Sequence, residues 1–188
     1  MNATASDEDA DIAKAVAVLG NGGIVAHACE GVWGLACDPW SETAVTKILS
    51  IKHRDETKGL IVIAHDSCIF DAEICELELN KQEMVRGSWP GHTTWILPSE
   101  RFSKLVTGDR LTIALRVPDH KQARELCRRY GKPLVSTSAN ISNKPPAKTR
   151  AEIHEILGSV VDFVLPGRIG DATGPSTIRD ALTGAKLR

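Results

Sequence analysis

The stretch LVSTSANISNKPPAKT, residues 134–149, changes abruptly from an apolar run to short hydroxyl and amide side chains. Its first residues predict the end of a buried strand. The polar side chains that follow belong to Ser136, Thr137, Ser138, Asn140, Ser142 and Asn143. Short side chains of this kind bring hydrogen-bonding groups close to a ligand at little cost in conformational entropy. The stretch therefore predicts a polar, ligand-facing loop at a strand end.

The exit from this loop is stiff and leads into a helix. Lys144 and Lys148 flank a Pro-Pro pair. Thr149, followed three residues later by Glu152, has the capping-box pattern of a helix start. Open α/β sheets tend to bind anions where a strand end, a polar loop and a helix N-terminus meet. A solvated serine and asparagine loop fits the same spacing, so both interpretations stay open.

Length and composition indicate one soluble globular domain over residues 1–188. A chain of 188 residues and 20.3 kDa is long enough to bury a core. Hydrophobic residues make up 42% of the chain and charged residues 25%, which is ordinary for a soluble protein. The net charge is −1, so any basic surface must come from the local placement of lysines and arginines.

The five cysteines predict neither disulfides nor a metal site, because their number is odd and no CxxC or Cys/His spacing is present. The N-terminus is acidic and lacks the basic and apolar pattern of a secretory signal. No apolar stretch approaches the roughly 20 residues that span a bilayer. We therefore expect a cytoplasmic protein with reduced thiols and no membrane association.

Alternating helix and strand patterns predict an α/β fold with a twisted mixed sheet flanked by helices. Residues 60–64, LIVIA, are typical of a central strand covered on both faces. Residues 111–117 alternate instead. Leu111, Ile113, Leu115 and Val117 fall on one face, and Thr112, Ala114 and Arg116 on the other. An arginine on a mid-sheet face is costly unless that face lines a cavity.

Three further charged residues each fit both a structural and a functional interpretation. Lys52 and Arg54 follow a helix whose expected cap is Ser41, and basic residues at a helix C-terminus are favoured by the macrodipole. The same pair offers a point charge and a planar fork, which suit a polyphosphate. Glu30 lies in a glycine-containing apolar turn. It either caps a neighbouring backbone or pairs with a core arginine, or it serves a site.

Several segments together resemble the YrdC-like family, in its short single-domain form. They are SIKHRDETKGLIVI, SWPGHTTWILP, TIALRVPDH, GKPLVSTSAN and PSTIRDALTG, and their order and rough spacing match. The resemblance covers about residues 10–188. Longer relatives carry an additional C-terminal domain, and this sequence stops before it. The resemblance implies a YrdC-like α/β domain with an open basic cavity on one face of its sheet.

The resemblance also implies a reaction. Such proteins join L-threonine, bicarbonate and ATP into L-threonylcarbamoyl-AMP and pyrophosphate. The product then serves N6-threonylcarbamoyladenosine formation on tRNA, together with downstream modification proteins. ATP is thus expected as a substrate, with Mg²⁺ held by its phosphates and no metal ligand from the protein.

The family's motifs assign individual residues. Its KxR motif corresponds to Lys52 and Arg54, and its SxN motif to Ser138 and Asn140. The resemblance places ATP near Lys52, Arg54, Thr112, Ser138 and Asn140. It places threonine near Cys29, Arg116, Ser138 and Ser176.

Two segments depart from the family pattern. Where the family commonly has Tyr-Pro-Thr-Glu, residues 27–30 are His-Ala-Cys-Glu, so Cys29 replaces a threonine implicated in amino-acid binding. Where the family commonly has Gly-Pro-Val-Thr, residues 91–94 are Gly-His-Thr-Thr. These changes leave the expected nucleotide half intact and alter the amino-acid half. Glu30 and His92 are candidates for accepting the amine proton.

Two other functions compete with this one. A basic face could hold double-stranded RNA by its phosphates in ribosomal RNA maturation, without catalysis. The net charge of −1 and the few aromatic side chains argue against it. A nucleotide-responsive regulatory domain that binds ATP without synthesis is the third possibility. Threonine-dependent turnover of ATP distinguishes the enzyme from both.

Overall fold

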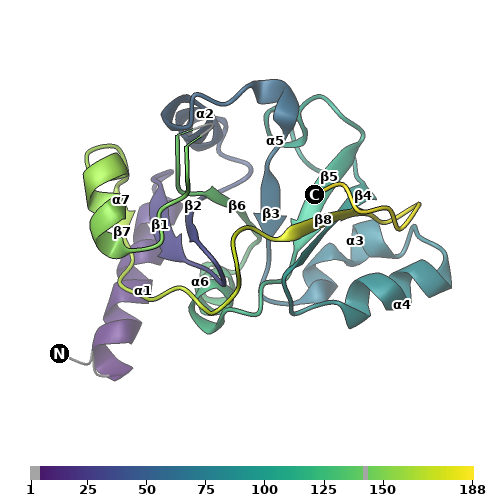
Figure 1. Ribbon diagram of the computed structural model, residues 1–188, viewed down its shortest axis with the longest axis horizontal. Helices are drawn as coiled ribbons and strands as arrows, with labels where there is room; N and C mark the ends of the chain where they lie inside the picture. The colour runs from purple at the N-terminus through teal and green to yellow at the C-terminus, as the bar shows by residue number, and fades with distance from the viewer. Residues whose placement is uncertain (1–4, 142–143) are drawn as a thin grey trace.

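The computed structural model describes residues 5–141 and 144–188, and its strands form one eight-stranded sheet (Figure 1). The strands are β1 (Val25–Ala28), β2 (Trp33–Cys37), β3 (Ile61–Ile63), β4 (Thr93–Pro98), β5 (Thr112–Arg116), β6 (Leu134–Ser138), β7 (Phe163–Val164) and β8 (Thr177–Asp180). The α-helices are α1 (Ala5–Gly20), α2 (Glu42–Ile51), α3 (Asp71–Ile74), α4 (Leu79–Gly87), α5 (Lys104–Thr107), α6 (Lys121–Tyr130) and α7 (Arg150–Leu157). Two short 3-10 helices are η1 (Glu56–Lys58) and η2 (Ser67–Phe70).

The sheet is mixed, as predicted. Its strand order is β7-β1-β2-β6-β3-β5-β4-β8. Strand β3 pairs in parallel with β5 and antiparallel with β6, and β6 pairs antiparallel with β2. Strand β6 is therefore inserted between two strands that come much earlier in the chain. The prediction of an α/β domain with a mixed sheet flanked by helices is confirmed.

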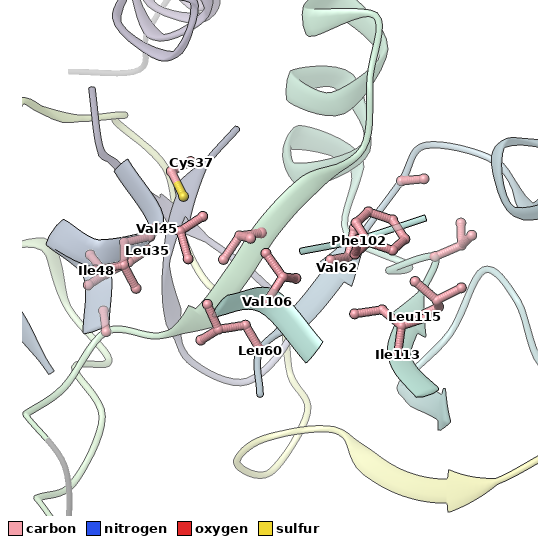
Figure 2. Packing of buried hydrophobic residues seen from close by; sticks show 14 of the residues in the cluster. Leu35, Cys37, Val45, Ile48, Leu60, Val62, Phe102, Val106, Ile113 and Leu115 are labelled. Carbon is pink, nitrogen blue, oxygen red and sulfur yellow. The ribbon is translucent and has the colours of Figure 1, made fainter. Parts of the chain in front are cut away.

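Two apolar clusters lie on the two faces of the sheet. The larger one joins α2 and α5 to the face of Leu35, Val62 and Leu115 (Figure 2). The smaller one joins α1 and α6 to the opposite face, near Val25 and Ile63. Figure 1 shows α2 and α5 together on one side and α6 on the other. The smaller cluster leaves part of its face free, and that part carries the candidate site.

Two sequence expectations change at the site. The polar run after Val135 was expected to be a loop, but β6 continues through Ser138, so its hydroxyls alternate across a strand. Leu111 was expected on the buried face of its strand, yet it precedes β5 and is 77% exposed. The capping box of Thr149 and Glu152 at the start of α7 is confirmed. No helix within residues 5–141 and 144–188 is long and apolar enough to cross a bilayer.

Candidate functional site

A cavity of about 270 Å³ opens on the sheet face that α1 and α6 leave free. Alternation along the strands brings Gly34 of β2, Ser136 and Ser138 of β6, and Ala114 and Arg116 of β5 into its wall. Its basic side chains come from Arg54, Lys58, Arg110, Arg116 and Arg188. Glu30 is the acidic side chain that the described part of the chain places in this wall. The wall is therefore suited to an anionic ligand.

Lys52 lies beneath the cavity wall and is 1% exposed. Its ammonium donates to the backbone oxygen of Ser138, to the backbone oxygen of Asn140 at 3.0 Å and to Asn140 Oδ1 at 2.8 Å. These contacts use all three N–H groups of the ammonium. Burial, followed by the charge of Arg54, lowers the pKa of Lys52 to about 7. The expected convergence of Lys52 with the Ser138–Asn140 bend is therefore present.

The Ser138–Asn140 bend is held by its own side chains as well. Ser138 Oγ donates to Asn140 Oδ1 at 2.7 Å, and Asn140 Nδ2 donates to the Lys144 oxygen at 2.7 Å. Because the amide and hydroxyl are tied to each other and to Lys52, the bend is rigid before any ligand arrives. Ser142 and Asn143, which the sequence also indicated here, lie outside the described residues.

Arg54 lines the cavity at the end of the turn that follows α2. Its Nε and Nη2 donate to the backbone oxygen of Gly59 at 3.2 and 2.9 Å. Burial, together with the charges of Arg188 and Arg110, lowers the pKa of Arg54. Three arginines thus repel one another at this end of the cavity, and a polyanion would relieve that repulsion.

The interpretation of Glu30 as the partner of a core arginine holds. Arg116 Nη2 donates to Glu30 Oε1, and the backbone N–H of Asp119 donates to the same oxygen at 2.7 Å. Glu30 and Arg116 are both buried. Although burial opposes it, the charge of Arg116 keeps the pKa of Glu30 below its ordinary value. Glu30 therefore stays ionised and neutralises one of the cavity's cations.

Arg116 is held from several sides, which limits how it can meet a carboxylate. Its Nε donates to the Gly91 oxygen at 2.9 Å, and its Nη2 also lies 3.0 Å from His92 Nδ1. Of its nitrogens, Nη1 has no hydrogen-bond partner within the described residues. The expected bidentate pairing with threonine would need Arg116 to share or exchange Glu30.

Cys29 and His92, two of the residues that depart from the family pattern, lie at the two ends of this ion pair. Cys29 Sγ donates to Glu30 Oε2 at 2.7 Å, and burial, then Glu30, raises the pKa of this thiol to about 12. Cys29 therefore acts as a protonated donor and not as a nucleophile. His92 lines the cavity, and its buried Nε2 has no partner within the described residues. Burial, then Arg116, lowers the pKa of His92.

The cavity wall contains six of the eight predicted site residues, namely Cys29, Arg54, Thr112, Arg116, Ser138 and Ser176. Lys52 and Asn140 are not in the wall; they lie behind it and hold its bend. Arg110 and Arg188 line the cavity but were missed. The turn at Thr183-Gly184 was a usable signal for Arg188, because it folds the last residues back along β8. Arg188 then donates to the Ser176 oxygen at 3.0 Å.

The described residues offer no metal site. No group of three His, Cys, Asp or Glu side chains within residues 5–141 and 144–188 could hold a metal ion. Glu30, the acid of the cavity wall, already receives Arg116 and the Asp119 N–H. The donor set of this wall therefore suits anions and not a protein-bound cation.

Comparison with known proteins shows which family the chain is related to. A family model described as Sua5_yciO_yrdC, telomere recombination, matches residues 17–188. The chain belongs to the Sua5/YciO/YrdC family.

Individual members of the family match along most of the chain. Threonylcarbamoyl-AMP synthase of Vibrio vulnificus (strain YJ016) is 44% identical over 181 residues, covering 95% of this chain and 97% of that protein. The protein of the same name from Halorhodospira halophila (strain DSM 244 / SL1) is 43% identical over 178 residues, covering 94% of this chain and 93% of its own length. The crystal structure of P. abyssi Sua5 complexed with L-threonine matches with a TM-score of 0.84 and 28% identity, over 90% of this chain. The match spans only 50% of that Sua5 chain.

His27, which lies buried beside the site, makes the stability of the fold depend on pH. It is fully buried, and burial lowers its pKa from 6.5 to about 4. The unfolded chain therefore takes up this proton at a higher pH than the folded protein does. Between these two values the unfolded state binds more protons, so the free energy of unfolding falls as the pH falls.

We expect this effect to approach about 3 kcal/mol below pH 4 and to vanish above pH 6.5. Urea unfolding of the wild type and His27→Gln at about pH 7 and at about pH 4.5 measures it. The variant should lose less stability on acidification than the wild type. Equal losses of stability in both proteins would mean that protonation of His27 is not the cause of this pH dependence.

Proposed function

We propose that the protein is an L-threonylcarbamoyl-AMP synthase, which forms this adenylate and pyrophosphate from L-threonine, bicarbonate and ATP. The observation that carries the proposal is the convergence of the Lys52–Arg54 pair and the Ser138–Asn140 bend at one cavity with a basic wall. Relatives named threonylcarbamoyl-AMP synthase, 43–44% identical over nearly the whole chain, support it.

The reaction requires the protein to orient the three reactants and to neutralise the charge of the phosphates. It does not require a nucleophile from the protein. The amine of threonine captures bicarbonate or its dehydrated form, and the resulting carbamate oxygen attacks the α-phosphate of ATP. Holding the three reactants together can lower the barrier by several kcal/mol, up to about 7–11 in ideal cases. Cations fixed against the phosphates stabilise the charge that develops during transfer.

The residues divide this work between two ends of the cavity. Arg54, Thr112 and the Ser138–Asn140 bend receive ATP, with Lys52 supplying positive charge from beneath the bend. Arg116, Cys29 and Ser176 receive threonine, and Ser176 is fixed for this by Thr94, whose Oγ1 lies 2.7 Å from its Oγ. Arg188 and Arg110 add charge near Arg54. Mg²⁺ accompanies ATP and is held by the phosphates and water.

The biological setting follows from the product. Residues 1–188 act as one catalytic domain in the cytoplasm, where the five free cysteines stay reduced. An adenylate is reactive toward water, so it passes to tRNA-modification proteins that transfer the threonylcarbamoyl group. Direct RNA contact is a separate and weaker proposal, because the basic residues gather inside a cavity. Steeply salt-dependent RNA binding would support it.

The deciding experiment is to incubate the protein with ATP, L-threonine and bicarbonate and to detect the adenylate by mass spectrometry. We expect threonylcarbamoyl-AMP and pyrophosphate in equal amounts. Parallel samples without threonine or without bicarbonate should contain neither. ATP turnover that does not depend on threonine, or no turnover at all, would reject the proposal.

Cys29→Thr tests the amino-acid half of the site. A threonine hydroxyl can donate to Glu30 Oε2 as the thiol does, and an O–H group is a stronger donor than S–H. We expect Cys29→Thr to bind L-threonine at least as tightly as the wild type in calorimetry. Cys29→Ala, which removes the donor, should bind it more weakly by up to about tenfold. Collapse of affinity in Cys29→Thr would mean that residue 29 does not occupy the amino-acid end.

A further inference from the structure

A buried histidine is joined to a serine of the cavity wall by a route that the proposed function does not use. His27 of β1 is fully buried, and its Nε2 lies 3.0 Å from Ser136 Oγ on β6. Strand β2 runs between these two strands, and its residue opposite His27 is Gly34. A Cβ on Gly34 would lie 2.9 Å from His27 Nε2 and 3.1 Å from Ser136 Oγ. Because Gly34 has no side chain, the imidazole of His27 can reach over β2 to Ser136.

The other ring nitrogen of His27 determines which atom carries the proton. His27 Nδ1 lies 3.0 Å from the backbone oxygen of Ala28. A carbonyl oxygen only accepts, so Nδ1 is the protonated nitrogen. The ring is fully buried and neutral at physiological pH, and Nε2 is then a bare acceptor. Ser136 must therefore donate its hydroxyl proton to Nε2.

This donation fixes the polarity that Ser136 presents to the cavity. A serine hydroxyl has one proton and two lone pairs. With the proton committed to His27, the oxygen can only accept hydrogen bonds from a ligand. The neighbouring Ser138 hydroxyl is committed in the same way, to Asn140 Oδ1 at 2.7 Å. The oxygens of both β6 serines thus face the cavity as acceptors, next to a set of arginines that attract anionic groups.

We propose that His27 is a positioning residue that locks Ser136 as a hydrogen-bond acceptor, so that the site selects an amino acid by an N–H or O–H donor at this point. The inference rests on the proposed function, because it assumes that an amino acid occupies this cavity. The donor is either the substrate's amine or its side-chain hydroxyl. An acceptor without a proton to give away would hold an amine without protonating it further, which suits an amine that must attack bicarbonate. It would also repel a carboxylate, which leaves that group to Arg116.

A double-mutant cycle separates this role from a purely structural one. L-Threonine binding is measured by calorimetry for the wild type, Ser136→Ala, His27→Phe and the double variant. We expect each single change to weaken binding by about five- to tenfold, which corresponds to one hydrogen bond. The double variant should be no weaker than the weaker single variant within about twofold, because His27 acts through Ser136. Independent losses that multiply in the double variant would overturn the proposal.

Three further measurements complete the test. His27→Gln, which can place an amide oxygen near the position of Nε2, should recover binding to within about threefold of the wild type. ATP binding should stay within about twofold of the wild type in every variant, and parallel loss of both ligands would indicate a structural effect. L-2-Aminobutyrate, which lacks the hydroxyl, identifies the donor. If the His27→Phe penalty disappears with this ligand, the donor is the hydroxyl; if it persists, the donor is the amine.

The outcome of this cycle is distinct from that of the proposed function. Wild-type protein that binds threonine but shows multiplying losses overturns the role of His27 alone. Wild-type protein that neither binds threonine nor forms the adenylate overturns both. Gly34→Ala gives an independent check, because its methyl group would lie 2.9 Å from His27 Nε2 and 3.1 Å from Ser136 Oγ and would force the two side chains apart while keeping both in the chain. It should weaken L-threonine binding to about the same extent as His27→Phe.

Discussion

Replacing Lys52 with alanine is expected to reduce threonylcarbamoyl-AMP formation by at least about 10²-fold, the cost of removing a preorganised charge from a reaction site. The ammonium binds both backbone oxygens of the Ser138–Asn140 bend as well as the Asn140 side chain. Its loss removes one donor from each of these three acceptors, although the Ser138 oxygen keeps the Asn140 N–H and Asn140 Oδ1 keeps the Ser138 hydroxyl, and it lets the bend move. The defect should therefore be larger in kcat than in threonine affinity. Pyrophosphate release at saturating substrates, together with calorimetry for threonine, measures both.

Lys47→Ala provides the matched control. Lys47 lies on α2, the helix that ends just before Lys52; its side chain is 44% exposed and pairs with Asp162 at 2.9 Å. Exposed pairs of this kind contribute little, so we expect turnover to be unchanged and stability to shift by less than about 1 kcal/mol. Lys52→Ala should still unfold cooperatively, since α2 and its packing are retained. Normal turnover in Lys52→Ala would reject both the charge and the positioning role of this residue.

Replacing Arg116 with leucine is expected to lower the free energy of unfolding by about 3–5 kcal/mol, because the buried carboxylate of Glu30 would lose its cationic partner. Glu30 would keep only the Asp119 N–H and the Cys29 thiol as donors. The same change removes the cation that is proposed to receive the threonine carboxylate. Urea unfolding monitored by circular dichroism measures the stability, and calorimetry measures the affinity for threonine.

The double variant Arg116→Leu/Glu30→Leu separates the two effects. Removing both partners of a buried pair is far less costly than removing one, so we expect most of the stability to return. Threonine binding should remain lost, because the cation is still absent. Arg124→Leu is the control, since Arg124 pairs with Asp119 at 3.7 Å near the surface. If Arg116→Leu were as stable as this control, the ion pair would not be holding the site together.

Local pattern was enough to predict a mixed sheet flanked by helices and part of the cavity wall, whereas the family resemblance supplied Cys29, Thr112 and Ser176. The alternation of β5 placed Arg116 on a cavity-facing side, and the residue types of Lys52, Arg54 and Ser138 indicated anion binding. These inferences worked because strand period and side-chain chemistry are local properties. The same alternation was extended one residue too far at Leu111, because β5 begins only at Thr112 and period alone does not mark where a strand starts.

What the sequence could not supply were contacts set by strand order. Glu30 and Arg116 are 86 residues apart, and His27 and Ser136 are 109 apart. Each pair meets through the strand order β1-β2-β6-β3-β5, a set of neighbour relations that no local pattern encodes. Lys52 was assigned to the phosphates from its charge and from the family's KxR motif. Only the packed structure reveals that its donors are already occupied by the bend.

The insertion of β6 between β2 and β3 has a consequence for how the protein is made. A nascent chain that has emerged only as far as α6 contains both flanking strands, with a vacant slot between them. The edges of β2 and β3 that face this slot then have no hydrogen-bonding partner. They can pair with other chains until β6 is translated and inserts between them. Substrates can recognise only molecules that have passed this step, so nucleotide or amino acid present during refolding would draw the population toward completed chains.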